Sequence, residues 1–167
     1  MRDTDGFTLV EILVTIAILS ILLGIASVSA RDWVIRYQVE SQTRQVYADL
    51  MNARVNAMQR NRVFFVSMGA NQYAIYEDSF PSPDGNGDLD TGAGQDRLVI
   101  QQTAQYTLVS SPTATFNFTA NGLASSATAA VVDIHCQSTA NPASDCIEVS
   151  LTRILMGKWN GSTCITQ

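Results

Sequence analysis

The stretch GFTLVEILVTIAILSILLGIA, residues 6–26, decides how the rest of the chain is interpreted. From Phe7 to Ala30 the chain contains one ionisable residue, Glu11, and no proline. A helix of this length measures about 36 Å, which is enough to cross a hydrocarbon layer of roughly 30 Å. Because the segment is apolar on every face, it predicts a helix buried in a membrane and not a helix of a soluble core.

Glu11 is the unusual residue of this segment. An unpaired carboxylate inside a membrane span is costly, and the span contains no basic residue that could pair with it. Two explanations stay open. Glu11 lies at the headgroup boundary and is tolerated there, or it pairs with a cation from outside the span, such as an amine created by cleavage of this chain or a neighbour.

The residues MRDTDG followed by FTLVEILVTIAILSIL resemble the class III signal of type IV prepilins and pseudopilins. That signal is a short polar leader ending in Gly, then Phe, Thr-Leu-Val-Glu and a long apolar helix. The resemblance implies that a prepilin peptidase cleaves between Gly6 and Phe7 and methylates the new N-terminus at Phe7. It further implies that Glu11 pairs with the N-terminal amine of an adjacent subunit during filament assembly, which would lower the cost of its charge.

The rest of the chain predicts an α+β fold, since a helical pattern comes first and strand patterns follow. Residues 31–62 carry apolar side chains at steps of one or two helical turns, so the helix should continue as an amphipathic segment of roughly 80 Å in total. Gly69-Ala70-Asn71 then marks a hairpin between Val63–Ser67 and Gln72–Glu77. Further strand-like runs are RLVIQQ, YTLVS, TFNFT, AAVVDIHC and CIEVSLTRI.

The order of motifs in this domain resembles the H-type pseudopilin and FimT/FimU minor-pilin family. It is carried by Arg60-Asn61-Arg62-Val63-Phe64-Phe65, the Tyr73–Tyr76 strand, the acidic loop 84–96 and Thr115–Gly122. The resemblance implies a type IV pilin-like fold, in which the long N-terminal helix packs on an antiparallel β-sheet or a two-sheet domain. The expected organisation is a leader over 1–6, a transmembrane or filament-core helix over 7–30, its amphipathic continuation over 31–62 and a periplasmic β domain over 63–167.

The net charge and the cysteine content indicate which partners and which compartment the protein has. A net charge of −5 argues against a general nucleic-acid binder. Three cysteines fit an oxidising compartment. Cys136 and Cys146 flank the loop QSTANPASD, and if the flanks pair as a hairpin the two sulfurs meet at its base, so we predict a Cys136–Cys146 disulfide. The alternative is Cys146–Cys164, which would tie the C-terminal tail to the sheet.

One group of side chains could bind a metal. Asp84, Asn86, Asp88 and Asp90 alternate in DGNGDLD, and oxygen side chains in a glycine-rich loop can converge on Ca²⁺. The alternative is a solvated acidic loop, because Asp, Asn and Gly are ordinary turn formers. No other cofactor is expected, and no catalytic motif is visible around the single histidine, His135.

These observations predict a structural subunit and not an enzyme. The preferred interpretation is a minor pilin that waits in the bacterial inner membrane with its domain in the periplasm and then enters a type IV pilus near the tip. Its partners would be the prepilin peptidase and other pilins or pseudopilins, through the N-terminal helix. The alternatives are an H-type minor pseudopilin of type II secretion and a DNA-uptake receptor. The receptor is disfavoured because TRILMGKW lacks the family's Gly-Arg-x-Arg-like ending, so nucleic acid is an unlikely partner.

Overall fold

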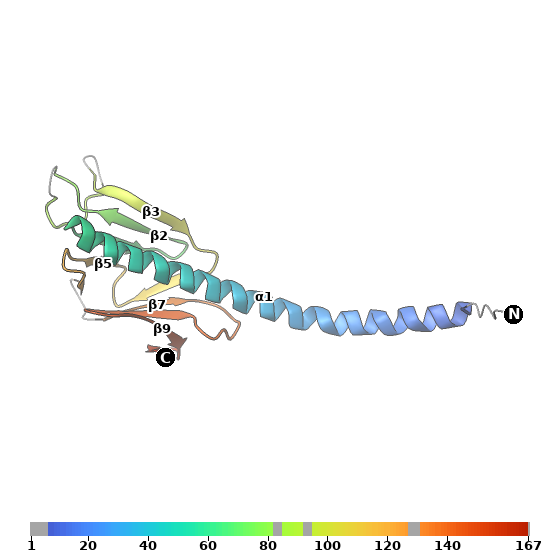
Figure 1. Cartoon of the computed structure of the whole chain (residues 1–167). Helices are drawn as coiled ribbons and strands as arrows, with labels where there is room; N and C mark the ends of the chain where they lie inside the picture. Colours follow the sequence, from blue (N-terminus) through green and yellow to red (C-terminus); the bar gives the residue numbers. More distant parts are fainter. Residues whose placement is uncertain (1–6, 82–84, 92–94, 127–130, 167) are drawn as a thin grey trace.

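The computed structural model describes residues 7–81, 85–91, 95–126 and 131–166, with the side chains of 25–30 left out. One helix, α1 (Leu9–Arg60), precedes all the strands of the described chain (Figure 1). The strands are β1 (Phe64–Met68), β2 (Gln72–Glu77), β3 (Arg97–Thr103), β4 (Leu108–Ser111), β5 (Thr115–Phe118), β6 (Ala124–Ser125), β7 (Val131–Cys136), β8 (Cys146–Ser150), β9 (Ile154–Trp159) and β10 (Cys164–Thr166).

Helix α1 has a capping residue at each end, Thr8 at the N-terminus and Asn61 at the C-terminus. Thr8 has extended backbone, and its hydroxyl accepts a hydrogen bond from the backbone N–H of Glu11 at 3.3 Å, which caps the N-terminus. Asn61 adopts the left-handed conformation with φ 54°, and its N–H donates to the carbonyl of Ala57. The helix is therefore continuous between these caps, which agrees with the predicted continuation beyond residue 30.

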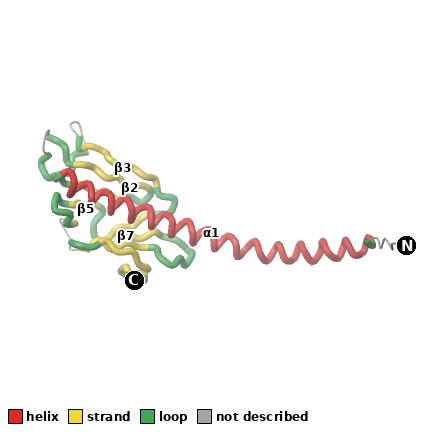
Figure 2. The backbone as a smooth tube through the Cα atoms, viewed as in Figure 1, coloured by secondary structure: helices red, strands yellow, loops and turns green. Residues whose placement is uncertain are grey.

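The strands form two antiparallel sheets that share the second half of α1 as their common partner. Their orders are β3-β2-β1-β5-β6 and β10-β9-β8-β7-β4. In Figure 2 the first half of the helix extends away from the strands, and its second half lies across both sheets. This architecture confirms the expected α+β, type IV pilin-like fold with a two-sheet domain.

The hydrophobic core lies between the helix and the two sheets. Val39, Val46 and Leu50 are completely buried, and their spacing of seven and four residues places them on one face of α1. This face packs in one cluster with Phe64 of the first sheet and Ile134 of the second. The amphipathic half of the helix is thus the element that joins the two sheets.

The predicted hairpin is confirmed, and one other strand prediction is wrong. Strands β1 and β2 pair antiparallel, with Phe64 opposite Glu77. The run CIEVSLTRI, in contrast, is not one strand. The N–H of Ser150 donates to the carbonyl of Arg153 at 2.8 Å, so the chain turns there and splits the run between β8 and the start of β9.

A carboxylate surrounded by three arginines fixes the C-terminal end of α1 to the first sheet. The side chain of Glu77 is only 6% exposed, and its oxygens lie 2.8 Å from Arg60, 3.6 Å from Arg97 and 3.9 Å from Arg62. Arg60 ends the helix and Arg97 begins β3, so one buried charge connects the helix to two strands. The Arg-Asn-Arg sequence therefore has a structural role, with both arginines turned toward the protein's own carboxylate.

Replacement of Glu77 by alanine should destabilise the domain by about 2 kcal/mol, because it removes the charged hydrogen bond with Arg60 and leaves three partly exposed arginines close together without their counter-charge. The measurement is the free energy of unfolding in urea. The matched control is Arg44→Ala, which removes an exposed ion pair with Glu40 within the helix and should cost less than about 0.5 kcal/mol. Equal losses for the two variants would show that Glu77 does not hold the helix to the sheet.

Candidate functional site

Residues 7–24, at the N-terminal end of the described chain, form an apolar rod that is exposed along its whole length. Every residue from Phe7 to Gly24 is exposed, and the large aliphatic side chains there include Leu9 at 75% and Leu23 at 68% exposed. Figure 1 shows the rod extending away from the domain. A continuous apolar surface of this size is far larger than a soluble monomer normally exposes, so it marks a contact surface for other molecules.

Within the described residues, no helix combines the length and the hydropathy that a membrane crossing requires.

Glu11 lies in the first turn of this rod. Its carboxylate is exposed among Val10, Ile12 and Leu13, and in the described part of the chain no cation is within ion-pair distance of it. The position is favourable for an anion, since the N-terminal end of a helix carries partial positive charge. Phe7 is 81% exposed just before the helix, while Gly6 lies outside the described residues. The arrangement leaves the charge available to a partner from another molecule.

Two glutamines fix the domain to α1 near the N-terminal end of the part of the helix that packs on the sheets. The side-chain oxygen of Gln42 accepts from the N–H groups of Gln105 and Tyr106 at 2.8 and 2.9 Å, and its amide nitrogen donates to the carbonyl of Tyr106. Gln38 accepts from the hydroxyl of Tyr106 at 2.8 Å. These contacts hold the β3–β4 loop against α1. Sequence reasoning missed them, because a glutamine on a helix face looks like an ordinary solvated residue.

The acidic loop between β2 and β3 is organised by two carboxylates that the sequence reasoning did not select. Asp78 accepts from the N–H groups of Asn86 and Gly87 at 3.1 and 2.8 Å. Asp96 accepts from Ser79, Phe80 and Asp90 in the same way. Both side chains are buried, and burial raises the pKa of Asp78 against the lowering effect of its two N–H donors.

The structure brings together only part of the predicted calcium site. Asp84 lies outside the described residues. Asn86 donates its side-chain amide to Asp90 at 2.8 Å and accepts from the N–H of Asp88 at 2.9 Å, so these groups satisfy one another. Among the described residues no group of three acidic, histidine or cysteine side chains is placed to hold a metal. Calcium binding here stays a prediction.

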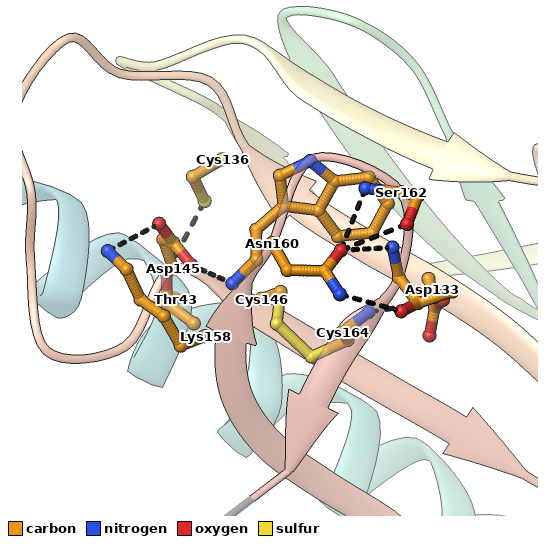
Figure 3. The surroundings of a disulfide bond; sticks show 11 residues. Thr43, Asp133, Cys136, Asp145, Cys146, Lys158, Asn160, Ser162 and Cys164 are labelled. Atoms are coloured by element: carbon orange, nitrogen blue, oxygen red, sulfur yellow. Dashed lines mark hydrogen bonds and ion pairs between the residues drawn. A yellow bond between two sulfur atoms is a disulfide. The ribbon is translucent and has the colours of Figure 1, made fainter.

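The predicted Cys136–Cys146 disulfide is wrong. The bond joins Cys146 to Cys164, which was the alternative (Figure 3). The hairpin that motivated the first prediction does exist, but its register places His135 opposite Cys146. Because neighbouring residues on a strand point to opposite faces, Cys136 and Cys146 project to different sides of the sheet and cannot meet.

Cys136 is a buried free thiol on the helix-facing side of the second sheet. Its sulfur accepts from the hydroxyl of Thr43 at 3.4 Å and from the amide of Gln42 at 3.5 Å. Burial is the main cause that raises the pKa of this thiol. The group is therefore part of the packing between α1 and β7.

A glycine in β9 makes room for the strand that carries Cys164. A Cβ atom at Gly157 would lie 2.3 Å from the backbone oxygen of Ile165 and 3.0 Å from the sulfur of Cys164. Around the bond, Asp145 accepts from the side chain of Lys158 at 3.0 Å and from the N–H of Trp159 (Figure 3). These contacts hold the C-terminal strands to the sheet.

His135 is a packing residue in this structure. Its ring stacks on Trp159 with a centroid distance of 4.1 Å and an angle of 11° between the planes. Burial lowers the pKa of His135, and the carboxylates of Asp145 and Asp133 oppose that shift. The ring lies on the outer side of the second sheet, on the same face as Cys146, which is opposite His135 in the register.

A helix that is bare and apolar along its first half and packs on two antiparallel sheets along its second defines the class of type IV pilin-like subunits. A family profile described as "Prokaryotic N-terminal methylation motif" matches residues 1–27, and one described as "Type II transport protein GspH" matches residues 42–152. The second match covers about two thirds of the chain, and the chain therefore belongs to the GspH family. The comparison with curated proteins found no significant match, and neither did the comparison with solved structures.

Membership in this family assigns the general class of the protein. The chain is a pilin or pseudopilin, from a family of structural subunits and not of enzymes. The family implies processing by a prepilin peptidase and assembly with other pilins.

Alkylation of the denatured, unreduced protein should modify one cysteine, Cys136, and leave the other two in a disulfide-linked peptide. Peptide mass spectrometry reads this directly. The Cys136→Ser variant should then take up no alkylating reagent and should still contain the bond. A labelled Cys164 in the unreduced protein would instead restore the Cys136–Cys146 pairing.

Replacement of Gly157 by alanine should destabilise the domain by about 1–3 kcal/mol, because the backbone of β10 must move to accept the methyl group. Thermal unfolding of the oxidised protein measures the loss. Gly24→Ala is the matched control, since a Cβ there meets no atom within 4 Å and alanine favours the helix. Unchanged stability of Gly157→Ala would mean that β10 does not pack on β9 as described.

Proposed function

We propose that this chain is a minor pilin, a structural subunit that enters a type IV pilus at or near its tip and supports pilus assembly. The observation that carries the proposal is the rod over residues 7–24, which is apolar on all sides and exposed. Burying such a surface among the equivalent helices of other subunits is strongly favourable, since apolar area removed from water contributes roughly 25 cal/mol per Å². The domain stays outside that helical core.

Glu11 would supply specificity to this packing. Its carboxylate is the only charge of the rod and has no ion-pair partner in the described chain. Cleavage between Gly6 and Phe7, followed by methylation, would give each subunit an N-terminal amine at the start of the helix. An amine of the neighbouring subunit placed beside Glu11 would neutralise the charge in a water-poor interior, where an unpaired charge is most costly. Misplaced helices would leave the carboxylate unpaired.

Before assembly the subunit would reside in the inner membrane through the same helix, with the β domain in the periplasm. The Cys146–Cys164 disulfide supports that placement of the domain, because disulfides persist in oxidising compartments such as the periplasm. The rod thus has an apolar environment in both stages, lipid first and neighbouring helices afterwards.

A second candidate is an H-type minor pseudopilin of type II secretion. The observation that favours it is the family description, "Type II transport protein GspH", over residues 42–152. Both candidates use the same helix and the same carboxylate, so the machine served has to be identified by its product, either surface pili or secreted protein.

The test is deletion of the gene in its native host, with surface pili, protein secretion and DNA uptake scored together. Loss of pili that the wild-type chain restores supports a minor pilin. Loss of secretion with normal pili replaces that proposal by the pseudopilin. Loss of DNA uptake alone would overturn both and favour a receptor.

Complementation with Glu11→Gln tests the proposed role of the carboxylate. We expect at least a roughly tenfold loss of pili, since a lost ion pair of more than about 1.4 kcal/mol lowers an association constant tenfold. Asp32→Asn is the matched control, because it makes the same chemical change at an exposed carboxylate further along the helix and should assemble normally. Equal assembly by Glu11→Gln and the wild type would refute the pairing.

A further inference from the structure

Two aromatic side chains stand together on the exposed helix between the rod and the domain. The rings of Trp33 and Tyr37 are stacked with a centroid distance of 6.0 Å and an angle of 17° between their planes. Trp33 is 68% and Tyr37 is 59% exposed, and neighbouring Val34 is 42% exposed. One turn of helix separates the two rings, so they form a single aromatic face that the domain leaves uncovered.

The aromatic pair follows an uncharged stretch of helix whose length matches the thickness of the hydrocarbon layer of a membrane. Residues 12–30 contain no ionisable side chain, and charges begin again at Arg31 and Asp32. The uncharged stretch is about 29 Å long as a helix, which corresponds to a hydrocarbon layer of roughly 30 Å. With that stretch in the hydrocarbon, Trp33 and Tyr37 fall just beyond it, where tryptophan and tyrosine concentrate in membrane proteins.

We propose that Trp33 and Tyr37 bind the periplasmic headgroup layer of the bilayer while the subunit waits for assembly, and that Arg31 and Arg36 on the same turns bind the phosphates of anionic lipids. This rests on the proposed membrane-resident stage of the function. Indole and phenol rings combine an apolar body with a polar tip, which suits a layer that is apolar on one side and wet on the other. Both arginines are exposed and can reach lipid phosphates.

The lipid layer fits this face better than the rod of a neighbouring subunit does. The middle of the rod carries only two side-chain hydroxyl oxygens that could accept a hydrogen bond, those of Thr15 and Ser20, and each lies against its own helix because it donates to the carbonyl of Ile12 or Ile16. A neighbouring rod therefore offers aliphatic surface with few partners for an indole N–H, a phenol hydroxyl or two guanidinium groups. Headgroups offer phosphate and ester oxygens to all four.

An anchor at Trp33 and Tyr37 also fixes the depth of Glu11 in the membrane. From Trp33 back to Glu11 the helix measures about 33 Å. An aromatic anchor at the periplasmic boundary therefore places Glu11 at the opposite boundary of the hydrocarbon layer, where its charge is tolerated until a neighbour supplies an amine. The pair would hold the helix at a depth that keeps Glu11 accessible to incoming subunits.

The test uses the full chain reconstituted in vesicles of phosphatidylcholine and phosphatidylglycerol that carry bromine atoms either near the headgroup or near the chain ends. The chain has two tryptophans, so Trp159→Phe leaves Trp33 as the only tryptophan, and excitation at a wavelength that tyrosine does not absorb reports on it alone. We expect blue-shifted Trp33 emission that shallow bromine quenches more strongly than deep bromine. Trp33→Phe is the matched control, and its remaining Trp159 in the β domain should be quenched by neither.

Three results would overturn the proposal. Trp33 emission typical of water and unaffected by bromine would place the pair outside the membrane. Stronger quenching by deep bromine would place it in the hydrocarbon. A blue shift that bromine does not affect, and that grows with the protein-to-lipid ratio, would show that a second subunit covers the pair. Failure of the protein to float with the vesicles would count against the membrane-resident stage itself, and would be seen before any fluorescence is read.

Discussion

The rest of this structure depends on an apolar helix surface, residues 7–24, that is exposed in the described part of the chain. The side chains from Phe7 to Leu23 are exposed in the described structure, although the same helix is completely buried at Val39, Val46 and Leu50. One helix therefore has two environments, and the boundary between them decides the architecture. The second half carries the domain, and the first half has to be covered by lipid or by other subunits. A filament subunit is a natural solution, since repeated copies of the same apolar rod can cover one another.

The domain is built to hold that helix in a defined orientation. The core packs one face of α1 against both sheets, and Glu77 fixes the C-terminal end of the helix through three arginines. Gln42 fixes the β3–β4 loop near the N-terminal end of the packed part of the helix. These contacts lie at opposite ends of the packed half, so together they resist rotation of the domain about the helix axis. Packing of rods inside a filament would then determine where the domains stand on its surface. The family matches follow the same boundary, because the methylation motif covers the rod within residues 1–27 and the GspH profile covers the packed part of α1 from residue 42 and the domain as far as residue 152.

The helix and the fold class were predictable because their signals are local. An apolar run, the later helical spacing and the change to strand-like runs are each read from neighbouring residues, and the class III signal occupies consecutive positions. The disulfide was not predictable in the same way. The turn after Ser150 is formed by Leu151, Thr152 and Arg153 without glycine, proline or asparagine, so it hid the start of β9, the strand on which β10 and Cys164 pair. The roles of Asp78 and Asp96 were also hidden, because each accepts hydrogen bonds from backbone that a long loop brings back.

The central claim is that Glu11 meets an amine of another subunit when the rods pack. The most direct measurement is zero-length cross-linking of carboxylates to amines in intact filaments, followed by peptide mass spectrometry. The account predicts a cross-linked peptide that joins Glu11 to the N-terminal residue of a neighbouring subunit, and predicts its loss in the Glu11→Gln variant. Free reaction of Glu11 with a small water-soluble amine in the same filaments would contradict the account, because it would show the carboxylate unpaired and open to solvent.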